Sequence, residues 1–445
     1  MDNLRMTHDT NPSVDELCFR SAAALAELIR SGQVSAGDVV EAHLRRIETV
    51  NPGINAVVQV DADRAREAAR AADALVRRGG SLPVLHGVPF TAKDNLETDG
   101  IITAIGVRER AAVVPTRDAT VVARMKAAGA ILLGKTNCPA WGGGSETVNE
   151  LYGRTRNPYD RDRSVSGSSG GEAAIIAAGG SPMGLGTDSG GSVRDPAHFC
   201  GLAALKPTAG LIPVTGVLDD QGQPGMMSDL RTQVGPIARS IADIVVITSV
   251  LAGPDGVDAG CVPISFRDPA SVSVKGMRVA VQLDNALAPP SPDTAATIRA
   301  AAAVLSASGA VVEDVAHPQD GHLLTREIWE SYEPGVSSLD LYRALRRWDD
   351  FRSRMLLWLA DWDVVLSPVY PTAAHLHDAP VPAGLSYTTP YSLTGWPCAI
   401  VRCGTSPDGL PIGAPVVAGP WRDHVALAVA AVLEDAIGGF RPPPL

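Results

Sequence analysis

The sequence between residues 167 and 192 begins with Gly167-Ser168-Ser169-Gly170-Gly171 and ends with Gly186-Thr187-Asp188-Ser189-Gly190-Gly191-Ser192. Glycines lack the Cβ atom that keeps a ligand away from the backbone, so both turns allow a small molecule to approach closely. The residues between them predict a short helix over 172–178 and a short strand over 183–186. Upstream, a strand-like stretch ends at Lys93. A lysine and two serines in such settings can supply a base, a relay and a nucleophile, which indicates hydrolytic chemistry.

Composition places the chain among globular enzymes rather than nucleic-acid-binding proteins. It has 445 residues, of which 45% are hydrophobic and 20% are charged, a balance that supports a large core. Its formal net charge of -11 argues against nucleic acid as a partner, because nucleic-acid-binding proteins present a basic face. We therefore expect a soluble enzyme whose small-molecule substrate is neutral or apolar.

The six cysteines form no C-x-x-C pair and no Cys/His cluster with metal-ligand spacing, so we expect no metal and no cofactor. Scattered thiols are typical of a reducing compartment. The polar segment 1–13 lacks the apolar region of a signal peptide, and no apolar run is long enough to cross a membrane. These observations predict a cytoplasmic protein without a membrane partner.

Helices and strands alternate along most of the chain, which predicts an α/β fold. Expected helices cover 21–30, 62–78, 119–128, 172–178, 241–251, 294–306, 318–360 and 425–436, and another starts after Ser35; Ser35, Asp61, Asp118 and Ser240 are the expected N-caps. Expected strands cover 56–60, 130–133, 183–186, 278–282, 310–313, 363–366, 399–402 and 416–417. We find no linker, so we expect one domain over 1–445, with a central mixed, twisted sheet covered by helices on both faces. The amphipathic segment 318–360 is expected to form a helical cover over part of the substrate pocket.

Serine is a poor nucleophile at neutral pH and needs a nearby base. One candidate is His198, which could complete a Ser-His-Asp arrangement with Ser192. Pro196 lies between the two and no G-x-S-x-G elbow surrounds Ser192, which favours a structural role for His198. The other candidate is Lys93. Burial behind the apolar residues 88–90 lowers the pKa of an amine, as a neutral base requires, so Lys93 is the preferred base.

A phosphate-binding motif is also present, in Gly129-Ala130-Ile131-Leu132-Leu133-Gly134-Lys135-Thr136. A true P-loop needs a helix that starts at its Lys-Thr pair, but Pro139 and the glycines 142–144 prevent one here. The apolar residues 130–133 fit a buried strand better. We therefore interpret Lys135 as the end of a core strand and expect no nucleotide.

The segment from 166 to 206 resembles the amidase signature hydrolases, which include bacterial amidases, fatty acid amide hydrolase and the amidotransferase component that acts on glutaminyl-tRNA. The matching runs are Gly167 to Glu172, Gly179 to Pro182, Gly184 to Arg194, Pro196-Ala197, Phe199 to Gly201 and Lys206 to Thr208. The segments 87–94, 127–137, 153–158, 235–243 and 393–395 are similar too, so the resemblance covers nearly the whole chain and is thinnest over 255–385. It implies the amidase signature fold.

The resemblance also implies a role for each of the three polar side chains. Ser192 is the expected nucleophile, Ser168, on a cis peptide, the bridging serine, and Lys93 the base. The backbone amides of Ser189, Gly190, Gly191 and Ser192 are expected to form the oxyanion hole. The reaction then passes through an acyl-enzyme on Ser192 that water resolves.

Further residues near these turns are candidates for support and for substrate binding. Asp188 and Arg194 flank the second turn with opposite charges, which predicts an ion pair that braces it; two solvated surface charges are the alternative. Gly142, beside Trp141, falls where the family presents a backbone carbonyl to the leaving N–H of the substrate. The candidate pocket walls are Trp141, Met226, Met227, Tyr387, Tyr391 and Trp396.

Two departures from the family pattern bear on the substrate. Leu211 follows Gly210 where most relatives have an arginine that helps hold a charged amino acid, and this weakens the amidotransferase hypothesis. Ala414-Pro415 stands where relatives often have a glutamine. We predict an amidase for aryl or alkyl amides. The alternative is a urethanase that hydrolyses carbamates through the same relay, and a glutaminyl-tRNA amidotransferase A-type subunit ranks third. A homodimer is left open.

Overall fold

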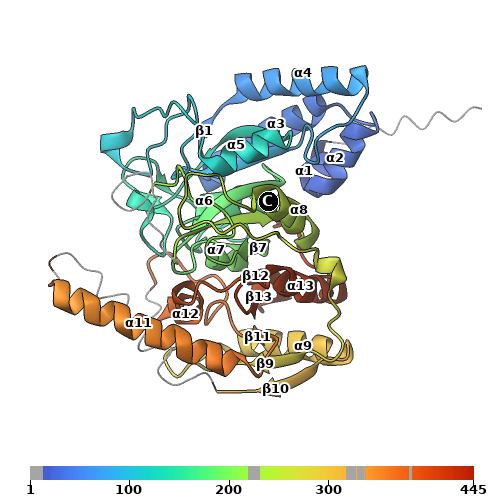
Figure 1. The fold of residues 1–445 in the computed structure, drawn as a ribbon. Helices are drawn as coiled ribbons and strands as arrows, with labels where there is room; N and C mark the ends of the chain where they lie inside the picture. The colour runs from blue at the N-terminus through green and yellow to red at the C-terminus, as the bar shows by residue number, and fades with distance from the viewer. Residues whose placement is uncertain (1–13, 219–230, 317–326, 328–334, 336, 380–382) are drawn as a thin grey trace, which may run out of the picture.

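An 11-stranded mixed sheet forms the centre of the protein, in the order β1-β3-β2-β6-β8-β7-β12-β13-β11-β9-β10 (Figure 1). The computed structural model describes residues 14–218, 231–316, 327, 335, 337–379 and 383–445. The strands of this sheet are β1 (Val57–Val60), β2 (Pro89–Lys93), β3 (Ile131–Thr136), β6 (Met183–Asp188), β7 (Ala203–Lys206), β8 (Gln233–Ala238), β9 (Arg278–Val281), β10 (Val311–Asp314), β11 (Val364–Leu366), β12 (Cys398–Thr405) and β13 (Pro411–Ala418). A separate ladder pairs β4 (Val148–Asn149) with β5 (Gly153–Arg154).

Helices flank this sheet, which confirms the predicted α/β fold (Figure 1). They are α1 (Val14–Phe19), α2 (Ala22–Arg30), α3 (Ala36–Ile54), α4 (Ala62–Arg78), α5 (Thr120–Ala127), α6 (Gly170–Ala177), α7 (Arg194–Phe199), α8 (Ile241–Leu251), α9 (Pro292–Ala307), α11 (Ser338–Leu359), α12 (Thr389–Leu393) and α13 (Asp423–Ile437). Short 3-10 turns occur at Arg108–Arg110, Ala140–Gly142, Pro269–Ser271 and Gly384–Tyr387.

Strand direction brings the candidate catalytic residues to one edge of the sheet. β2 pairs in parallel with both β3 and β6, so the carboxyl ends of these strands lie at the same edge. Lys93 ends β2, and Asp188 ends β6. The turn that carries Ser192 follows β6 directly, while α6 begins just after the turn that carries Ser168. The mixed sheet therefore places a lysine and two glycine-rich turns close together.

Helix starts follow the predicted caps at three of the proposed positions. Ser35 forms a capping box with Asp38, and Ser240 accepts the Asp243 N–H at 3.2 Å. Asp61 precedes α4 as expected, although its side chain makes no cap hydrogen bond. The Asp118 prediction was wrong. The helix starts at Thr120, and the Asp118 carboxylate instead accepts the Asp99 N–H at 2.9 Å and pairs with Lys126 at 2.8 Å.

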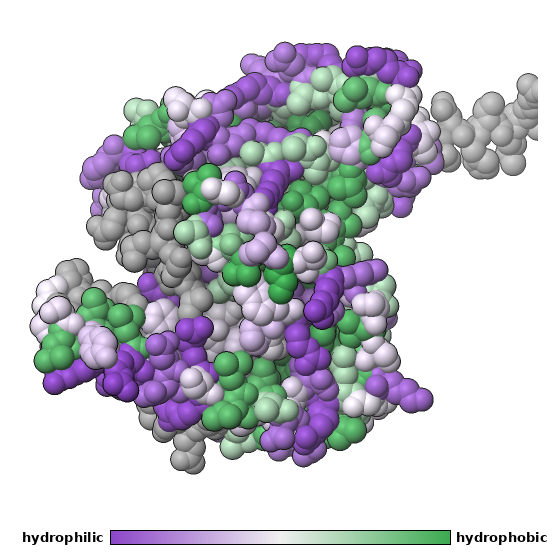
Figure 2. All heavy atoms as spheres, viewed as in Figure 1, coloured by the Kyte–Doolittle hydropathy of each residue, from purple (hydrophilic) through white to green (hydrophobic). Residues whose placement is uncertain are grey.

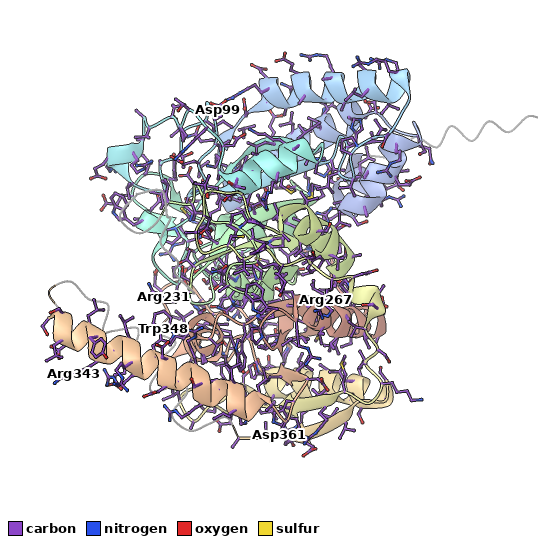
Figure 3. The ribbon with its side chains drawn as sticks, in the orientation of Figure 1. Asp99, Arg231, Arg267, Arg343, Trp348 and Asp361 are labelled. Atoms are coloured by element: carbon purple, nitrogen blue, oxygen red, sulfur yellow. The ribbon has the colours of Figure 1, made fainter. Side chains whose placement is uncertain are left out.

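α11 corresponds to the described part of the predicted helical cover 318–360. Its buried face packs against the core and contains Ala344, Trp348, Phe351, Met355 and Leu359. Figure 1 shows its N-terminal end projecting from the body of the protein, and Figure 3 places Trp348 between that end and the sheet. Its outer face exposes Leu339, Leu341 and Leu345 among charged residues, a mixture visible at the lower left of Figure 2.

Candidate active site

Lys93 is a fully buried lysine at the end of β2. Its Nζ donates to Ser168 Oγ at 2.6 Å and to Thr187 Oγ1 at 2.8 Å. Thr187 Oγ1 also accepts from Asn95 Nδ2 at 3.1 Å. The amine is thus held between the hydroxyls of Ser168 and Thr187, and Asn95, two residues after Lys93, donates to the same threonine.

Burial is the main reason why the pKa of the Lys93 amine falls from 10.5 to about 8. Negative charge on Cys138, Asp188 or Glu172 opposes this fall, because it stabilises the ammonium form. Cys138 remains a neutral thiol at neutral pH, since burial raises its own pKa to about 12. A fraction of Lys93 is therefore an uncharged amine near neutral pH, and such an amine can accept a proton.

The turn before α6 presents Ser168 to Lys93 and contacts the second turn. The peptide bond between Gly167 and Ser168 is cis. The backbone N–H of Ser169 donates to the carbonyl of Ser192 at 3.0 Å, and Ser169 Oγ donates to the carbonyl of Thr187 at 3.1 Å. Because Ser169 joins both ends of the second turn, the two turns form one rigid unit.

Ser192 is partly exposed, whereas Ser168 is buried. This difference suits a nucleophile that must reach a substrate and a relay that must stay dry. No side chain in the described part of the chain hydrogen-bonds to Ser192 Oγ, so the link between Ser168 and Ser192 is open in this structure. Catalytic hydrogen bonds are often long in free enzymes and shorten when substrate binds.

Asp188 and Arg194 form the ion pair that the sequence predicts, and both side chains are fully buried. Arg194 donates to both carboxylate oxygens, at 2.8 and 2.9 Å. Burial alone would raise the pKa of the Asp188 carboxyl, but Arg194 and the backbone N–H of Val193 lower it to about 2. The alternative of two solvated surface charges is excluded. The carboxylate accepts backbone N–H groups of Gly191 and Val193, on either side of Ser192, and so stabilises the turn that carries the candidate nucleophile.

The expected oxyanion hole needs one correction. The Gly191 N–H donates to Asp188 Oδ1 at 2.9 Å, so this amide is occupied and does not face a substrate. On the other side of the same peptide, the Gly190 carbonyl accepts from Thr388 Oγ1 at 2.6 Å. The direction of the Gly191 N–H could not be predicted from the sequence, because it depends on how the peptide between Gly190 and Gly191 is rotated. Ser189, Gly190 and Ser192 remain the candidate donors.

A second brace reaches the turn from α12, and sequence analysis missed it. Arg194 donates to the carbonyl of Thr388 at 2.6 Å and to Ser392 Oγ at 2.7 Å. α12 in turn is held by α11, since Trp348 Nε1 donates to the carbonyl of Leu393 at 2.7 Å. α11 therefore supports the turn that carries Ser192 through α12. Arg194 and Thr388 lie 194 positions apart in the sequence, and no local signal indicates their contact.

Thr187 and Asn95 were also missed, although both lie inside motifs that were noticed. Thr187 precedes Asp188 in the second turn, and Asn95 follows Lys93 by two positions. Their positions next to these motifs were the only signal in the sequence. The register between β2 and β6 is what brings the side chains of Lys93, Asn95 and Thr187 together.

The structure supports neither His198 as a base nor a phosphate-binding site at Lys135. His198 Nδ1 accepts the Gly413 N–H at 2.8 Å and its Nε2 bonds to the carbonyl of Thr372 at 3.0 Å, so this buried histidine is structural. Lys135 lies in β3, fully buried, and donates to the carbonyl of Leu96 and to Thr103 Oγ1. A lysine with these partners is the end of a core strand, as predicted, and not part of a phosphate-binding turn.

Most of the aromatic residues proposed as pocket walls belong to the core. Tyr387 donates to the carbonyls of Leu283 and Ala288, and Tyr391 stacks on Trp396 with both rings buried. Trp141 differs, because it is 37% exposed. Gly142 next to it is partly exposed, and Met226 and Met227 lie outside the described residues.

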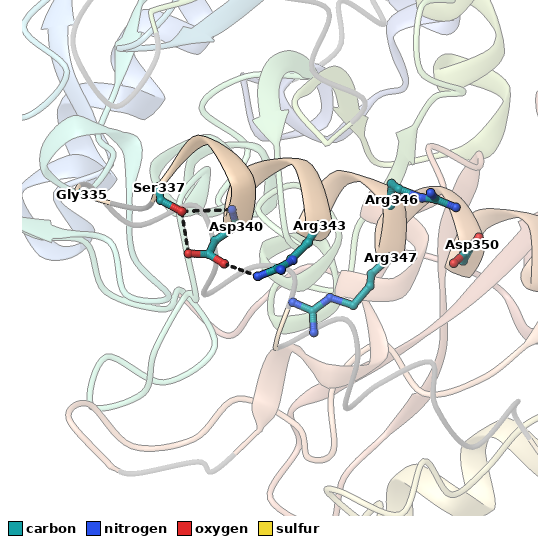
Figure 4. Close-up of a pocket in the computed structure, with 7 residues that line it drawn as sticks. All are labelled: Gly335, Ser337, Asp340, Arg343, Arg346, Arg347 and Asp350. Atoms are coloured by element: carbon teal, nitrogen blue, oxygen red, sulfur yellow. Dashed lines mark hydrogen bonds and ion pairs between the residues drawn. The ribbon is translucent and has the colours of Figure 1, made fainter.

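An open hollow of about 880 Å³ beside the N-terminal half of α11 is not the chemical centre (Figure 4). Its lining is mostly charged and contains none of the three candidate catalytic residues; it consists of Gly335, Ser337, Asp340, Arg343, Arg346, Arg347 and Asp350. Among the described residues, no cluster of three or more His, Cys, Asp or Glu side chains is arranged to hold a metal ion. None of the helices described is both long and apolar enough to cross a membrane.

Comparisons with known proteins agree with this geometry. The family model described as Amidase matches residues 38–339 and 331–427. The chain is 37% identical to the A-type subunit of the glutamyl-tRNA(Gln) amidotransferase of Roseiflexus castenholzii, over 73% of its own length and 64% of the relative, slightly less than two thirds. It is 33% identical to an acylamidase of Rhodococcus erythropolis, over 94% of this chain and 95% of the relative. The structure of a bacterial aryl acylamidase superposes with a TM-score of 0.84 at 26% identity and covers 94% of this chain and 96% of that one.

Proposed function

The chain belongs to the amidase family, and on that premise we propose that it hydrolyses the C–N bond of aryl or alkyl amides through an acyl-enzyme on Ser192. The observation that carries the proposal is the buried contact of 2.6 Å between Lys93 Nζ and Ser168 Oγ. An amine with a lowered pKa, one hydroxyl away from a partly exposed serine, is the arrangement that a lysine base requires.

In the first half of the reaction, uncharged Lys93 accepts the proton of Ser168, and Ser168 accepts the proton of Ser192. Ser192 Oγ forms a bond to the amide carbon as the carbonyl electron pair moves to oxygen. The amides of Ser189, Gly190 and Ser192 are the proposed donors to that oxyanion, and each well-aimed donor contributes about 3 kcal/mol. The burial of Lys93 keeps competing water away from the base.

In the second half, the proton must return to the substrate. An amide nitrogen leaves poorly unless it is protonated. The Lys93 ammonium passes its proton through Ser168 to the leaving nitrogen, the C–N bond breaks, and an acyl ester remains on Ser192. Water then attacks this ester with the same residues as base and relay, which releases the acid and restores Ser192.

The test is mass spectrometry of the purified chain after incubation with p-nitroacetanilide. We expect hydrolysis and a transient acyl adduct on the peptide that contains Ser192. Ser192→Ala should lose turnover by about 10³-fold or more while its thermal unfolding temperature stays within about 1 °C, because the side chain is partly exposed. Turnover that survives in Ser192→Ala would place the nucleophile elsewhere.

Carbamates are the alternative substrate class. A carbamate has the same carbonyl and the same leaving nitrogen, so Lys93, Ser168 and Ser192 can act on it without a change of role. Its carbonyl is less electrophilic, so the reaction rate depends more strongly on the hydrogen bonds from the oxyanion donors. A panel of matched anilides and aryl carbamates with the same aryl amine decides between the two, because the larger kcat/KM identifies the preferred class.

An amidotransferase A-type subunit is the other candidate, favoured by the 37% identity to such a subunit. Against it stands Leu211, which is 2% exposed in the core where the resemblance leads us to expect an arginine for a charged amino acid. Hydrolysis of simple amides by the isolated chain supports a free amidase. A chain that acts on glutamine, and only after partner subunits are added, would support the amidotransferase role.

A further inference from the structure

The strand end that carries Lys93 also anchors a loop on the other side of the site. Asp94 follows Lys93 and is fully buried. Its Oδ1 accepts the backbone N–H of Ala104 at 3.4 Å. This contact links Ala104, the first residue of the loop 104–106, to the residue that follows Lys93, the proposed base.

This loop holds Trp141 in an unusual backbone conformation. Ile105 has a φ of 50° and Trp141 a φ of 58°, both in the left-handed region that side chains with a Cβ rarely adopt. The carbonyl of Ile105 accepts the N–H of Trp141 at 3.0 Å. Strained residues of this kind persist only where the surrounding structure constrains them, and they cluster at ligand sites.

An apolar cluster lies next to the backbone of Trp141 and Gly142. Ile105 packs with Val107, Cys138 and Leu218 in a cluster separate from the main core. Its Cδ1 lies 3.8 Å from the position that a Cβ would take at Gly142. Leu218 is tied to the site from the opposite side, since its N–H donates to the carbonyl of Asn95 at 2.8 Å. The backbone at Trp141 and Gly142 thus lies against this apolar cluster, while the Trp141 side chain is 37% exposed.

The loop that follows Trp141 lies close to the bridging serine. The carbonyl oxygen of Gly144 lies 2.8 Å from where a Cβ on Gly167 would stand, so the loop after Trp141 packs directly on the residue before Ser168. In the proposed function, Ser168 returns the proton to the leaving nitrogen. The amine side of the substrate must therefore lie beside Ser168, and the group attached to that nitrogen points toward this loop.

We propose that Trp141, supported on Ile105 and held by the loop anchored on Asp94, recognises an aryl group on the amine side of the scissile bond. This inference rests on the proposed function and adds its specificity: anilides and N-aryl carbamates rather than primary or N-alkyl amides. Trp141 contacts the substrate, while Asp94 is a positioning residue that acts through the loop. The partly exposed indole offers an apolar ring face to an aromatic leaving group.

The kinetic test compares two substrates with the same acetyl group, acetanilide and acetamide, in the wild-type enzyme, Trp141→Ala and Trp141→Phe. We expect the ratio of kcat/KM for acetanilide to that for acetamide to fall about tenfold in Trp141→Ala and to be largely retained in Trp141→Phe. The control is Leu75→Ala, which shortens another exposed apolar side chain, 43% exposed on α4, and should leave the ratio unchanged. A ratio unchanged in Trp141→Ala, or a fall of equal size for both substrates, overturns the inference.

A second test separates the position of Trp141 from a general loss of activity. Benzamide carries its ring on the acyl side, so its kcat/KM relative to acetamide should be insensitive to Trp141→Ala; a fall as large as that for acetanilide would move Trp141 to the acyl side. Asp94→Asn, which keeps the size of the side chain, should raise the KM for acetanilide more than it lowers kcat. An effect of Asp94→Asn on kcat alone contradicts the positioning role.

A binding measurement distinguishes failure of this inference from failure of the proposed function. Calorimetry with Ser192→Ala and with Ser192→Ala/Trp141→Ala measures acetanilide binding without turnover. We expect binding about tenfold weaker in the double variant. If the wild-type enzyme hydrolyses neither amide but this difference is present, the proposed function fails and the aryl site stands. Equal binding by the two variants overturns the aryl site whatever the turnover.

Discussion

Replacing Thr187 by valine tests how the protein sets the protonation of its base. The Thr187 hydroxyl accepts a hydrogen bond from Lys93 Nζ at 2.8 Å, and valine has nearly the same shape without the hydroxyl. A hydrogen bond to the charged form of a group raises the pKa of an amine. We therefore expect Thr187→Val to lower the pKa of Lys93 below its value of about 8.

The size of the shift follows from the geometry. A hydrogen bond to a charged group contributes about 1.5–3 kcal/mol, and about 1.4 kcal/mol corresponds to one pKa unit. Loss of this bond should lower the pKa by about one to two units. Because the proposed base is the free amine of Lys93, the acid side of the kcat/KM profile should move to lower pH, from about 8 to between about 6 and 7.

The assay is the pH dependence of kcat/KM for p-nitroacetanilide from pH 5 to 10. Thr248→Val is a matched control, because Thr248 is equally buried but donates within α8 to the carbonyl of Ile244 at 2.7 Å. The control should keep the wild-type profile. An unmoved acid limb in Thr187→Val refutes the reasoning, and a limb moved to higher pH shows that the hydroxyl stabilises the neutral amine instead.

The remaining predictions concern residues around the turns. Gly184→Ala places a Cβ 1.7 Å from Glu172 Oε1, so we expect about 1–3 kcal/mol of destabilisation, seen as a lower unfolding temperature, whereas Gly143→Ala, with nothing within 4 Å of its Cβ, should leave that temperature unchanged. Equal unfolding temperatures for the two would contradict the packing argument. Asp195 is buried and has no hydrogen-bond partner among the residues that the structure describes; burial raises its pKa well above 3.8, so the folded protein keeps a proton that the unfolded chain releases above about pH 4. The stability that this group contributes is therefore lost as pH rises above 3.8. The unfolding temperature of Asp195→Asn minus that of the wild type should increase between pH 4.5 and 7.5. A constant difference across that range would show that the carboxyl is already ionised.

The sequence predicts the elements that depend on local signals. Ser35 and Ser240 cap helices as expected, and β9, α9 and β10 form the predicted β-α-β unit, with β9 and β10 parallel. The contact between Lys93 and Ser168 was inferred from a family resemblance, not from spacing, since the two residues lie far apart in the chain. Local patterns alone offered a lysine after a strand and two serines in turns.

Two prolines make one strand and one helix hard to predict from the sequence, because proline usually interrupts both. Pro236 lies inside β8, a central strand, where a missing N–H normally breaks a ladder. It is tolerated because β7 pairs with β8 only at Ala238 and Ile237, so Pro236 has no partner on that side. Pro196, between Ser192 and His198, lies in the first turn of α7, where backbone N–H groups have no helical acceptor.

The braces of the site depend on long-range packing and so leave no pattern in the sequence. Thr388 and Ser392 reach Arg194 from the start and the body of α12, and Tyr391 and Trp396 turned out to be core residues because their rings pack inward. The Gly191 amide was expected in the oxyanion hole and is instead bonded to Asp188. A single peptide rotation decides that outcome, and composition and spacing carry no information on it.

The most direct measurement of the central claim is the titration of the Lys93 amine itself. The chain has five lysines, Lys93, Lys126, Lys135, Lys206 and Lys275, so ¹³C labelling at Cε gives a simple NMR spectrum. Burial also lowers the pKa of Lys135 and of Lys206 to about 8, and the spectrum of Lys93→Arg therefore assigns the Lys93 signal by its absence. We predict that this signal titrates near pH 8, in step with the acid limb of kcat/KM. A Lys93 amine that stays protonated above pH 10 would contradict a neutral lysine as the base.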